Sequence, residues 1–274
     1  MAATAPRLQR QFPLLDLRPS RTTPTLVPPP PPVEPGQSEA VRRLRASLDA
    51  AVAAKVTSAT ELIRALDKRR RDDSIPTTLA PLDALLGGGL RRGNVVEIVA
   101  RRPSGRFSVV VSALAAATSM GEAAALIDLG DHLDPQLAAE NGVDLERLLW
   151  VRPHTMKQAV MAAEMLTATG FQLVVIDAGL HPIKGKRRAP DAAWVRLARA
   201  AEGHGTAMLV SSPYPLTGTM SEGVVRAVSA RPKWLGKGNA PRLLAGLDAT
   251  FTIDRHRHLR PGATVSCELR AVSS

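Results

Sequence analysis

The residues whose types and spacing suggest chemistry lie in residues 94–108, which read NVVEIVARRPSGRFS. The apolar run at residues 95–99 is typical of a buried strand, the sequence Pro-Ser-Gly at residues 103–105 turns the chain, and residues 109–117 continue as an apolar helix. A strand, a glycine-containing turn and a helix in this order form the architecture of a phosphate-binding loop. In the working form, G-x-x-x-x-G-K-[ST], backbone and lysine hold the phosphates and the hydroxyl holds magnesium.

The side chains at these positions do not supply that chemistry. The places of the two glycines, the lysine and the hydroxyl are taken by Ala100, Gly105, Arg106 and Phe107. A phenylalanine offers no oxygen to magnesium, and a planar guanidinium does not replace a compact ammonium group. We therefore interpret Ser104, Gly105, Arg106 and Phe107 as a vestigial loop that serves first as a scaffold, and we expect neither a bound metal nor ATP or another cofactor.

The elements around this loop alternate between strands and helices. Buried strands are expected at residues 123–128, 148–151, 171–177 and 207–212, a helix at residues 192–201, and final strands at residues 249–254 and 264–272. This alternation predicts an α/β fold with a mostly parallel sheet flanked by helices. The two last strands have no helix between them, which predicts an antiparallel edge.

Composition divides the 274-residue chain into three regions. Residues 1–36 include five consecutive prolines and few periodic apolar positions, which predicts a disordered tail. Residues 37–72 predict an amphipathic helix followed by a second helix, which is opened by a capping box at Ser58 and Glu61. Residues 73–274 are expected to form the core domain, with no further domain after it.

Charge and cysteine content restrict the function classes. Thirty-six Lys and Arg against 25 Asp and Glu give a net charge of +11 and a pI near 10.9, which favours a polyanionic partner such as nucleic acid. Cys267 is the single cysteine, so no disulfide framework or Cys-based zinc site is expected, and we expect it to be a small buried residue. The sequence lacks a signal peptide and an apolar run of about 18 residues, so we expect a cytoplasmic, nucleoid-associated protein without membrane contact.

A series of short motifs resembles the RecA recombinases. The motifs are SIPT at residues 74–77, LD at 82–83, GGGL at 87–90, VEI at 96–98, ID at 127–128, LDP at 133–135, GVD at 142–144 and VVID at 174–177. The likeness covers roughly residues 38–272 and implies a RecA-like core without the RecA C-terminal domain. It also implies that Asp177 takes the place of the Walker B aspartate.

Departures from the family imply that ATP hydrolysis is lost. RecA-like activity needs the loop lysine and hydroxyl, a catalytic carboxylate after the second strand and a glutamine after the fourth. The carboxylate position falls on Gly130 and the glutamine position on or next to Pro213, while Asp177 is retained. Several losses in one constellation leave neither a magnesium site nor a base to activate water. The neighbouring Asp131 is the residue that could replace the missing carboxylate.

The combination of a RecA-like core, a stripped ATPase site, a proline-rich start and a basic surface resembles the ImuA-like family of bacterial SOS mutagenesis proteins. The resemblance implies a noncatalytic adaptor in SOS-induced translesion DNA synthesis. The implied partners are an ImuB-type Y-family polymerase homologue and an error-prone replicative-type polymerase. RecA, or its filament, and single-stranded DNA are further candidate partners.

Three groups of basic residues are candidates for binding DNA or a protein partner. The candidates are Arg101 and Arg102 beside the loop, Lys184, Lys186, Arg187 and Arg188 after the strand that ends at Asp177, and Arg231, Lys233 and Lys237 around Trp234. The last two groups fall where the DNA-binding loops of RecA-like proteins lie. The alternatives are a turn and helix cap for the first group, a solvated loop for the second and core packing for Trp234.

Two alternative functions stay open. The chain could be a nucleotide-gated DNA-binding protein that still holds ATP through Gly105, Arg106 and Asp177. It could also be a nucleotide-independent single-stranded DNA-binding protein whose affinity depends strongly on salt. His256 and His258 would share one face of a strand, but without a third ligand no metal is expected there.

Overall fold

A computed structural model describes residues 73–102, 104–179, 189–236 and 242–270 of the chain. The described residues all belong to one compact unit within residues 59–274. Several predictions lie outside the described residues: the tail at residues 1–36, the helices at residues 37–72, the basic segment at residues 184–188, and Lys237. Within the described part, no helix is long and apolar enough to cross a membrane.

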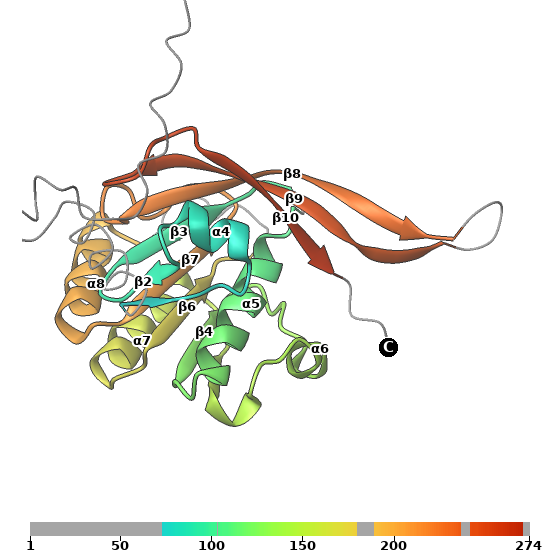
Figure 1. Cartoon of the computed structure of the whole chain (residues 1–274). Coiled ribbons are helices and arrows are strands. Elements are labelled where there is room, and N and C mark those ends of the chain that lie inside the picture. Colours follow the sequence, from blue (N-terminus) through green and yellow to red (C-terminus); the bar gives the residue numbers. More distant parts are fainter. Residues whose placement is uncertain (1–72, 103, 180–188, 237–241, 271–274) are drawn as a thin grey trace, which may run out of the picture. The chain divides into compact units, whose positions relative to one another are not determined.

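An eight-stranded sheet organises the described residues, in the order β10-β9-β8-β3-β7-β6-β4-β5 (Figure 1). Its strands are β3 (Val95–Val99), β4 (Ala124–Asp128), β5 (Leu148–Val151), β6 (Leu173–Asp177), β7 (Ala207–Ser212), β8 (Gly223–Leu235), β9 (Leu243–His256) and β10 (Thr264–Arg270). Every pairing from β8 through β3 to β5 is parallel, and β9 pairs antiparallel with both β8 and β10. The mostly parallel sheet with an antiparallel edge is therefore confirmed.

Helices cover both faces of this sheet (Figure 1). The helices are α4 (Ala80–Leu85), α5 (Arg106–Ser119), α6 (Pro135–Glu140), α7 (Met156–Ala168) and α8 (Asp191–His204). One face packs against α4, α5 and α6, and the other against α7 and α8. A small two-stranded sheet of β1 (Ser74–Ile75) and β2 (Leu90–Arg91) precedes β3.

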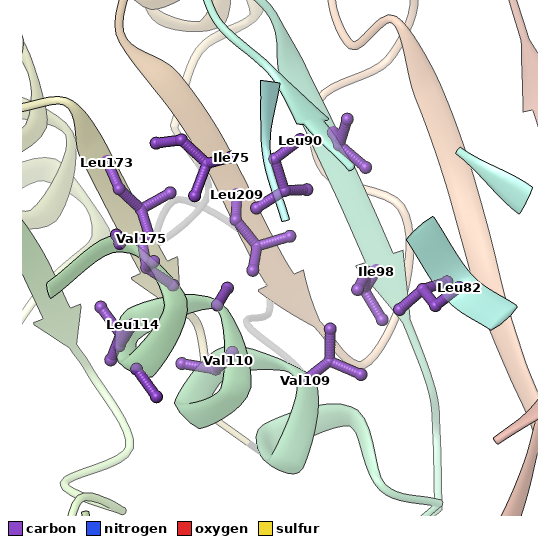
Figure 2. Packing of buried hydrophobic residues seen from close by; sticks show 14 of the residues in the cluster. Ile75, Leu82, Leu90, Ile98, Val109, Val110, Leu114, Leu173, Val175 and Leu209 are labelled. Atoms are coloured by element: carbon purple, nitrogen blue, oxygen red, sulfur yellow. The ribbon is translucent and has the colours of Figure 1, made fainter. Parts of the chain in front are cut away.

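The strands have the continuous apolar sequences expected of a sheet buried on both faces. Successive residues of β6 alternate between the two cores: Val175 packs on the α5 side and Ile176 on the α7 side. Figure 2 shows the α5 side, where Val110 and Leu114 of α5 face Val175 and Leu209 of the sheet. Burial of these side chains holds α5 against the sheet.

The carboxyl ends of the parallel strands bring the predicted site residues together. Asp128 at the end of β4 lies beside Asp177 at the end of β6, and Asp177 lies beside Ser211 of β7. β3 ends at Val99, in register with Ser212, so the vestigial loop leaves the sheet at this same edge. Ligands of open α/β sheets bind outside the carboxyl ends of the strands, and this edge is therefore the place to examine for a site.

The segment that contains Arg231, Lys233 and Trp234 is a strand. We expected these residues in the place of a second DNA-binding loop, but all three lie in β8, which forms a long hairpin with β9. β8 pairs with β3 only as far as Arg226, and β10 pairs with β9 only from Gly246 to Thr252. The distal part of the hairpin therefore extends past the neighbouring strands, as Figure 1 shows.

Candidate functional site

The vestigial loop lies between the end of β3 and the first turn of α5. Gly105 is the residue before α5 and has φ of 82°, a left-handed conformation that glycine adopts without a steric cost. A Cβ at this position would collide with Leu269 of β10 and lie 3.3 Å from the Cβ of Ala249 in β9. The antiparallel edge of the sheet therefore packs directly against the loop, and Ser104 is buried beside it.

Arg106 turns into the protein. Its side chain is 4% exposed. Nη1 donates hydrogen bonds to Asp177 Oδ1 at 2.9 Å and Ser211 Oγ at 2.6 Å, and Nη2 donates to the carbonyl of Gly179 at 2.8 Å. Burial lowers the pKa of Arg106 and the charge of Asp177 opposes that shift, but a guanidinium group stays protonated in proteins. The cation at the lysine position is thus bound to acceptors of its own chain.

Asp177 is fully buried, and both of its carboxylate oxygens have polar partners within hydrogen-bond distance. Oδ1 accepts from Arg106 and from Ser211 Oγ, the latter at 2.7 Å. Oδ2 lies 3.0 Å from Nδ1 of His132. Asp177, the predicted Walker B residue, is therefore joined to the predicted loop residue Arg106, and sequence reasoning did not identify Ser211 or His132 as their partners.

The position of the expected catalytic carboxylate has no space for a side chain. A Cβ at Gly130 would collide with the ring of His132 and lie 2.9 Å from the α-carbon of Gly179. Asp128 fixes this turn, because its carboxylate accepts the backbone N–H groups of Gly130 at 3.1 Å, His132 at 2.8 Å and Leu133 at 3.0 Å. The glycine at this position is therefore required by packing.

Asp131, the candidate replacement for that carboxylate, is exposed and forms an ion pair with Arg152. The hydrogen bond from Arg152 lowers the pKa of the Asp131 carboxyl group. A lowered pKa makes the carboxylate a weaker base. Arg152 also stacks on the ring of Trp150, 4.9 Å from its centroid, so its position is fixed on both sides.

Phe107, at the position of the magnesium-binding hydroxyl, contacts His132 edge-on, with ring centroids 5.8 Å apart. Both rings line a groove of about 660 Å³ between α5, α6, β10 and the residues just before α4. Leu137 and Leu269 also line it, so its surface beside the loop is partly apolar. The vestigial positions thus divide into an inward polar contact at Arg106 and an outward aromatic surface at Phe107.

Asp128, His132 and Asp177 are the described residues that come nearest to a metal-ligand set, with one ligand atom from each lying within 4.8 Å of the others. Other groups of the protein already bind the atoms that would hold a metal ion. The carboxylate oxygens already accept hydrogen bonds, and the guanidinium of Arg106 contacts Asp177. A divalent cation would have to displace these donors, so the arrangement fits an internal ion-pair network better than a metal centre.

A second buried polar cluster, which sequence reasoning missed, surrounds Glu97 in the middle of β3. Glu97 is fully buried, and its oxygens accept from Ser212 Oγ at 3.0 Å, Leu216 N at 2.6 Å and Thr217 Oγ1 at 2.6 Å. These bonds fix the start of the segment after β7, next to Pro213. The charged residue inside the apolar run VVEIV is the sequence feature that could have predicted this cluster, because a buried charge needs hydrogen-bond partners.

The remaining basic candidates differ in exposure and pairing. Arg101 and Arg102 are exposed beside the loop, and Arg231 is exposed on β8. Lys233 pairs with Asp248 at 2.9 Å and Glu268 at 3.3 Å, and these hydrogen bonds raise the pKa of its ammonium group. Trp234 is 52% exposed, so core packing for this residue is excluded.

The fold and the site define a phosphate-loop α/β protein whose loop cation and strand-end carboxylate bind each other. A family model described as the RecA N-terminal domain matches residues 48–184, half of the chain. The chain therefore belongs to the RecA family.

Similar proteins agree with this family. The chain is 43% identical to Protein RecA of Kineococcus radiotolerans over 136 residues, which are 48% of this chain and 39% of that protein. It is 45% identical to Protein RecA of Mycobacterium marinum over 105 residues, 38% of this chain and 30% of that protein. The chain thus matches less than half the length of these relatives. A crystal structure of the RadB recombinase shares the fold, with a TM-score of 0.53 and 17% identity over 70% of this chain and 94% of RadB.

Proposed function

We propose that this protein is a noncatalytic RecA-like adaptor in SOS-induced translesion DNA synthesis, of the ImuA-like type. The observation that carries the proposal is the buried contact between Arg106 and Asp177. In an ATPase of this class the loop cation and the strand-end carboxylate face the phosphates and magnesium. Here they neutralise each other, which supports a core that serves as a scaffold for surface recognition.

The surroundings of that contact support the same proposal. Gly130, where a catalytic carboxylate would be needed, is packed against Gly179. Asp131 is paired with Arg152, and the position expected for a phosphate-sensing glutamine falls on or next to Pro213, which is buried. We therefore propose that the protein does not hydrolyse ATP and needs no cofactor.

The proposed partners follow from the resemblance to ImuA-like proteins. They are an ImuB-type Y-family polymerase homologue and an error-prone replicative-type polymerase, with RecA and single-stranded DNA as further candidates. A cytoplasmic, nucleoid-associated location is part of this proposal. The net charge of +11 would favour the vicinity of DNA without requiring sequence-specific contacts.

Two measurements on the purified full-length protein test the proposal. ATP turnover should be undetectable with or without single-stranded DNA, and the purified ImuB-type homologue should bind in a titration by isothermal calorimetry. A matched RecA preparation serves as the positive control for turnover. Steady ATP hydrolysis that is lost in the Asp177→Ala variant would contradict the proposal, as would the absence of any binding by the polymerase homologue.

The alternative function is single-stranded DNA binding, either nucleotide-dependent or nucleotide-independent. The observation in its favour is the pair of exposed arginines, Arg101 and Arg102, beside the loop. It predicts that Arg101→Ala with Arg102→Ala weakens binding to an oligonucleotide and makes it less salt-dependent. If ATP and magnesium strengthen DNA binding of the wild-type protein, the nucleotide-dependent form of this alternative would be favoured.

A further inference from the structure

The end of the β8–β9 hairpin carries a cluster of exposed apolar side chains. We define the hairpin tip as Trp234 and Leu235 of β8 with Leu243 and Leu244 of β9. All four are exposed, Leu243 to 71%. Among the described residues, no other pair of neighbouring strands exposes so many large apolar side chains. Clustered exposed apolar residues mark interaction sites more often than scattered ones do.

The strand register places these side chains on both faces of the hairpin. Trp234 lies opposite Leu244, and Leu235 lies opposite Leu243. Successive residues of a strand point to opposite faces, so one apolar cross-strand pair lies on each face. Packing one face of the hairpin against the core would therefore leave the apolar pair on the other face exposed.

The rest of the described fold does not reach the tip. Pairing of β3 with β8 ends at Arg226, and pairing of β10 with β9 ends at Gly246. The tip residues lie beyond both limits, as the hairpin in Figure 1 shows. Within the described part of the chain, the tip therefore presents its apolar pairs to solvent.

The charges beside the tip favour an acidic neighbour. Arg231 and Arg242 flank it, both are exposed, and neither forms an ion pair among the described residues. Lys233 is already neutralised by Asp248 and Glu268. Two exposed guanidinium groups around an apolar centre match the usual anatomy of a protein interface, with an apolar centre and a polar rim.

Three possible occupants are distinguished by these features. Single-stranded DNA would use Trp234 for stacking but would gain little from the three leucines. A second copy would bring Arg231 and Arg242 of two positively charged chains together, and Pro232 on the open strand interrupts the donors that edge-to-edge pairing needs. An acidic protein surface with an apolar recess satisfies both the leucines and the arginines.

We propose that the hairpin tip inserts into an apolar recess, bordered by carboxylates, on the protein partner of this adaptor. This inference rests on the proposed function and assigns its binding surface. The tip supplies one aromatic and three aliphatic side chains, and the two arginines orient it. Trp and Arg are the residue types most often found as energetic anchors in interfaces.

The test measures binding of the purified ImuB-type homologue to full-length variants by isothermal calorimetry. Trp234→Ser with Leu244→Ser removes the apolar pair on one face, and Leu235→Ser with Leu243→Ser removes the pair on the other. Each should weaken binding about thirtyfold or more, as loss of central anchor residues does. The matched control is Met161→Ser with Met165→Ser on α7, two exposed apolar residues outside the tip, which should leave affinity unchanged.

A second pair of variants tests the charges. Arg231→Glu with Arg242→Glu should weaken binding and reverse its salt dependence, because like charges then face each other. Lys157→Glu on α7 with Arg199→Glu on α8 makes the same change in net charge at two exposed residues outside the tip and should have a smaller effect. Urea unfolding of each variant checks that the fold is retained.

The outcomes separate this inference from the proposed function. If the wild-type protein and both tip variants bind the polymerase homologue equally, the tip is not the docking surface, while the adaptor function stands. If the wild-type protein does not bind it, the proposed function fails and this inference fails with it. Loss of self-association or of oligonucleotide binding in the tip variants, with polymerase binding intact, would also overturn the inference in favour of a second copy or DNA.

Discussion

Arg106, the first residue of α5, donates a hydrogen bond from Nη1 to Oδ1 of Asp177, the last residue of β6, across 2.9 Å. Both residues stand where a nucleotide motor would hold its phosphates and its metal. Ser211 and His132 complete the coordination of the carboxylate. Side chains of the chain itself therefore occupy the carboxylate of Asp177, and the effect of removing them can be measured.

Removal of the guanidinium should destabilise the protein strongly. Arg106→Ala leaves the buried Asp177 carboxylate without its counter-charge, and loss of one partner of a buried ion pair costs about 3–5 kcal/mol. Urea denaturation followed by circular dichroism measures the change in the free energy of unfolding. Arg101→Ala, an exposed neighbour, is the control and should change stability by less than about 0.5 kcal/mol. A stable Arg106→Ala protein would show that the pair contributes little.

Restoring the lysine and the hydroxyl of a working phosphate-binding loop should not restore ATP hydrolysis. The double variant Arg106→Lys with Phe107→Thr supplies an ammonium group and a hydroxyl, but no carboxylate can be placed at Gly130. We expect ATP turnover to stay at background in a coupled assay with single-stranded DNA present. Turnover above background in this variant, abolished by Asp177→Ala, would mean that the losses elsewhere in the site are not decisive.

Gly130 should tolerate no side chain. In Gly130→Ala the new Cβ would meet the α-carbon of Gly179 at 2.9 Å as well as the His132 ring, and overpacking of this kind costs about 1–3 kcal/mol. Gly203→Ala in α8 is the matched control, because a Cβ there meets no atom within 4 Å. The control should be neutral or stabilising by up to about 1 kcal/mol. Equal thermal stability of the two variants would contradict the packing argument.

Glu97 should control the order of the segment after β7. Glu97→Ala removes the acceptor for Ser212, Leu216 and Thr217, and buried donors left unsatisfied cost about 1–3 kcal/mol each. We expect faster hydrogen exchange at the amides of Leu216 and Thr217 and lower stability in urea. The exposed Glu202→Ala in α8 is the control. Unchanged exchange in Glu97→Ala would show that the segment is fixed by other contacts.

Cys267 provides a test of pH dependence. Burial raises the pKa of its thiol above the ordinary value, so in the pH range between the two pKa values the folded state holds this proton more tightly than the unfolded state. The thiol therefore contributes stability that is lost as pH rises through that range, from about 9 upward. Above about pH 9, the free energy of unfolding should fall more steeply with rising pH in the wild type than in Cys267→Ala. Parallel curves for the two proteins would exclude this contribution.

The sequence predicted the elements whose signal is local. The strand at residues 95–99 and the strand at residues 148–151 agree with β3 and β5, because continuous apolar runs between turns are typical of buried parallel strands. β8 was missed because its distal residues, including Arg231, Pro232 and Lys233, lack that pattern. Its conformation depends on pairing with β9, a contact that local propensity does not encode.

At the site, too, the residue types could be predicted from the local sequence, whereas contacts between residues far apart in the chain could not. The missing lysine and hydroxyl could be read from the loop alone, and so could the retained aspartate at position 177. The inward turn of Arg106 could not, because its acceptor lies 71 residues away. The spacing of the motifs predicted that the catalytic carboxylate position falls on Gly130. The reason that this residue must remain glycine is its contact with Gly179, which forms only in the folded sheet.

The partnership of Arg106 with Asp177 also bears on regulation. A recombinase-type motor changes shape as triphosphate is bound and spent, so its state follows the energy charge of the cell. Under the proposed function, a protein whose own cation and anion bind each other at that edge would receive no such input, and we expect the same surface to be presented in starved and in growing cells. Control would then lie in how much of the protein is made and when.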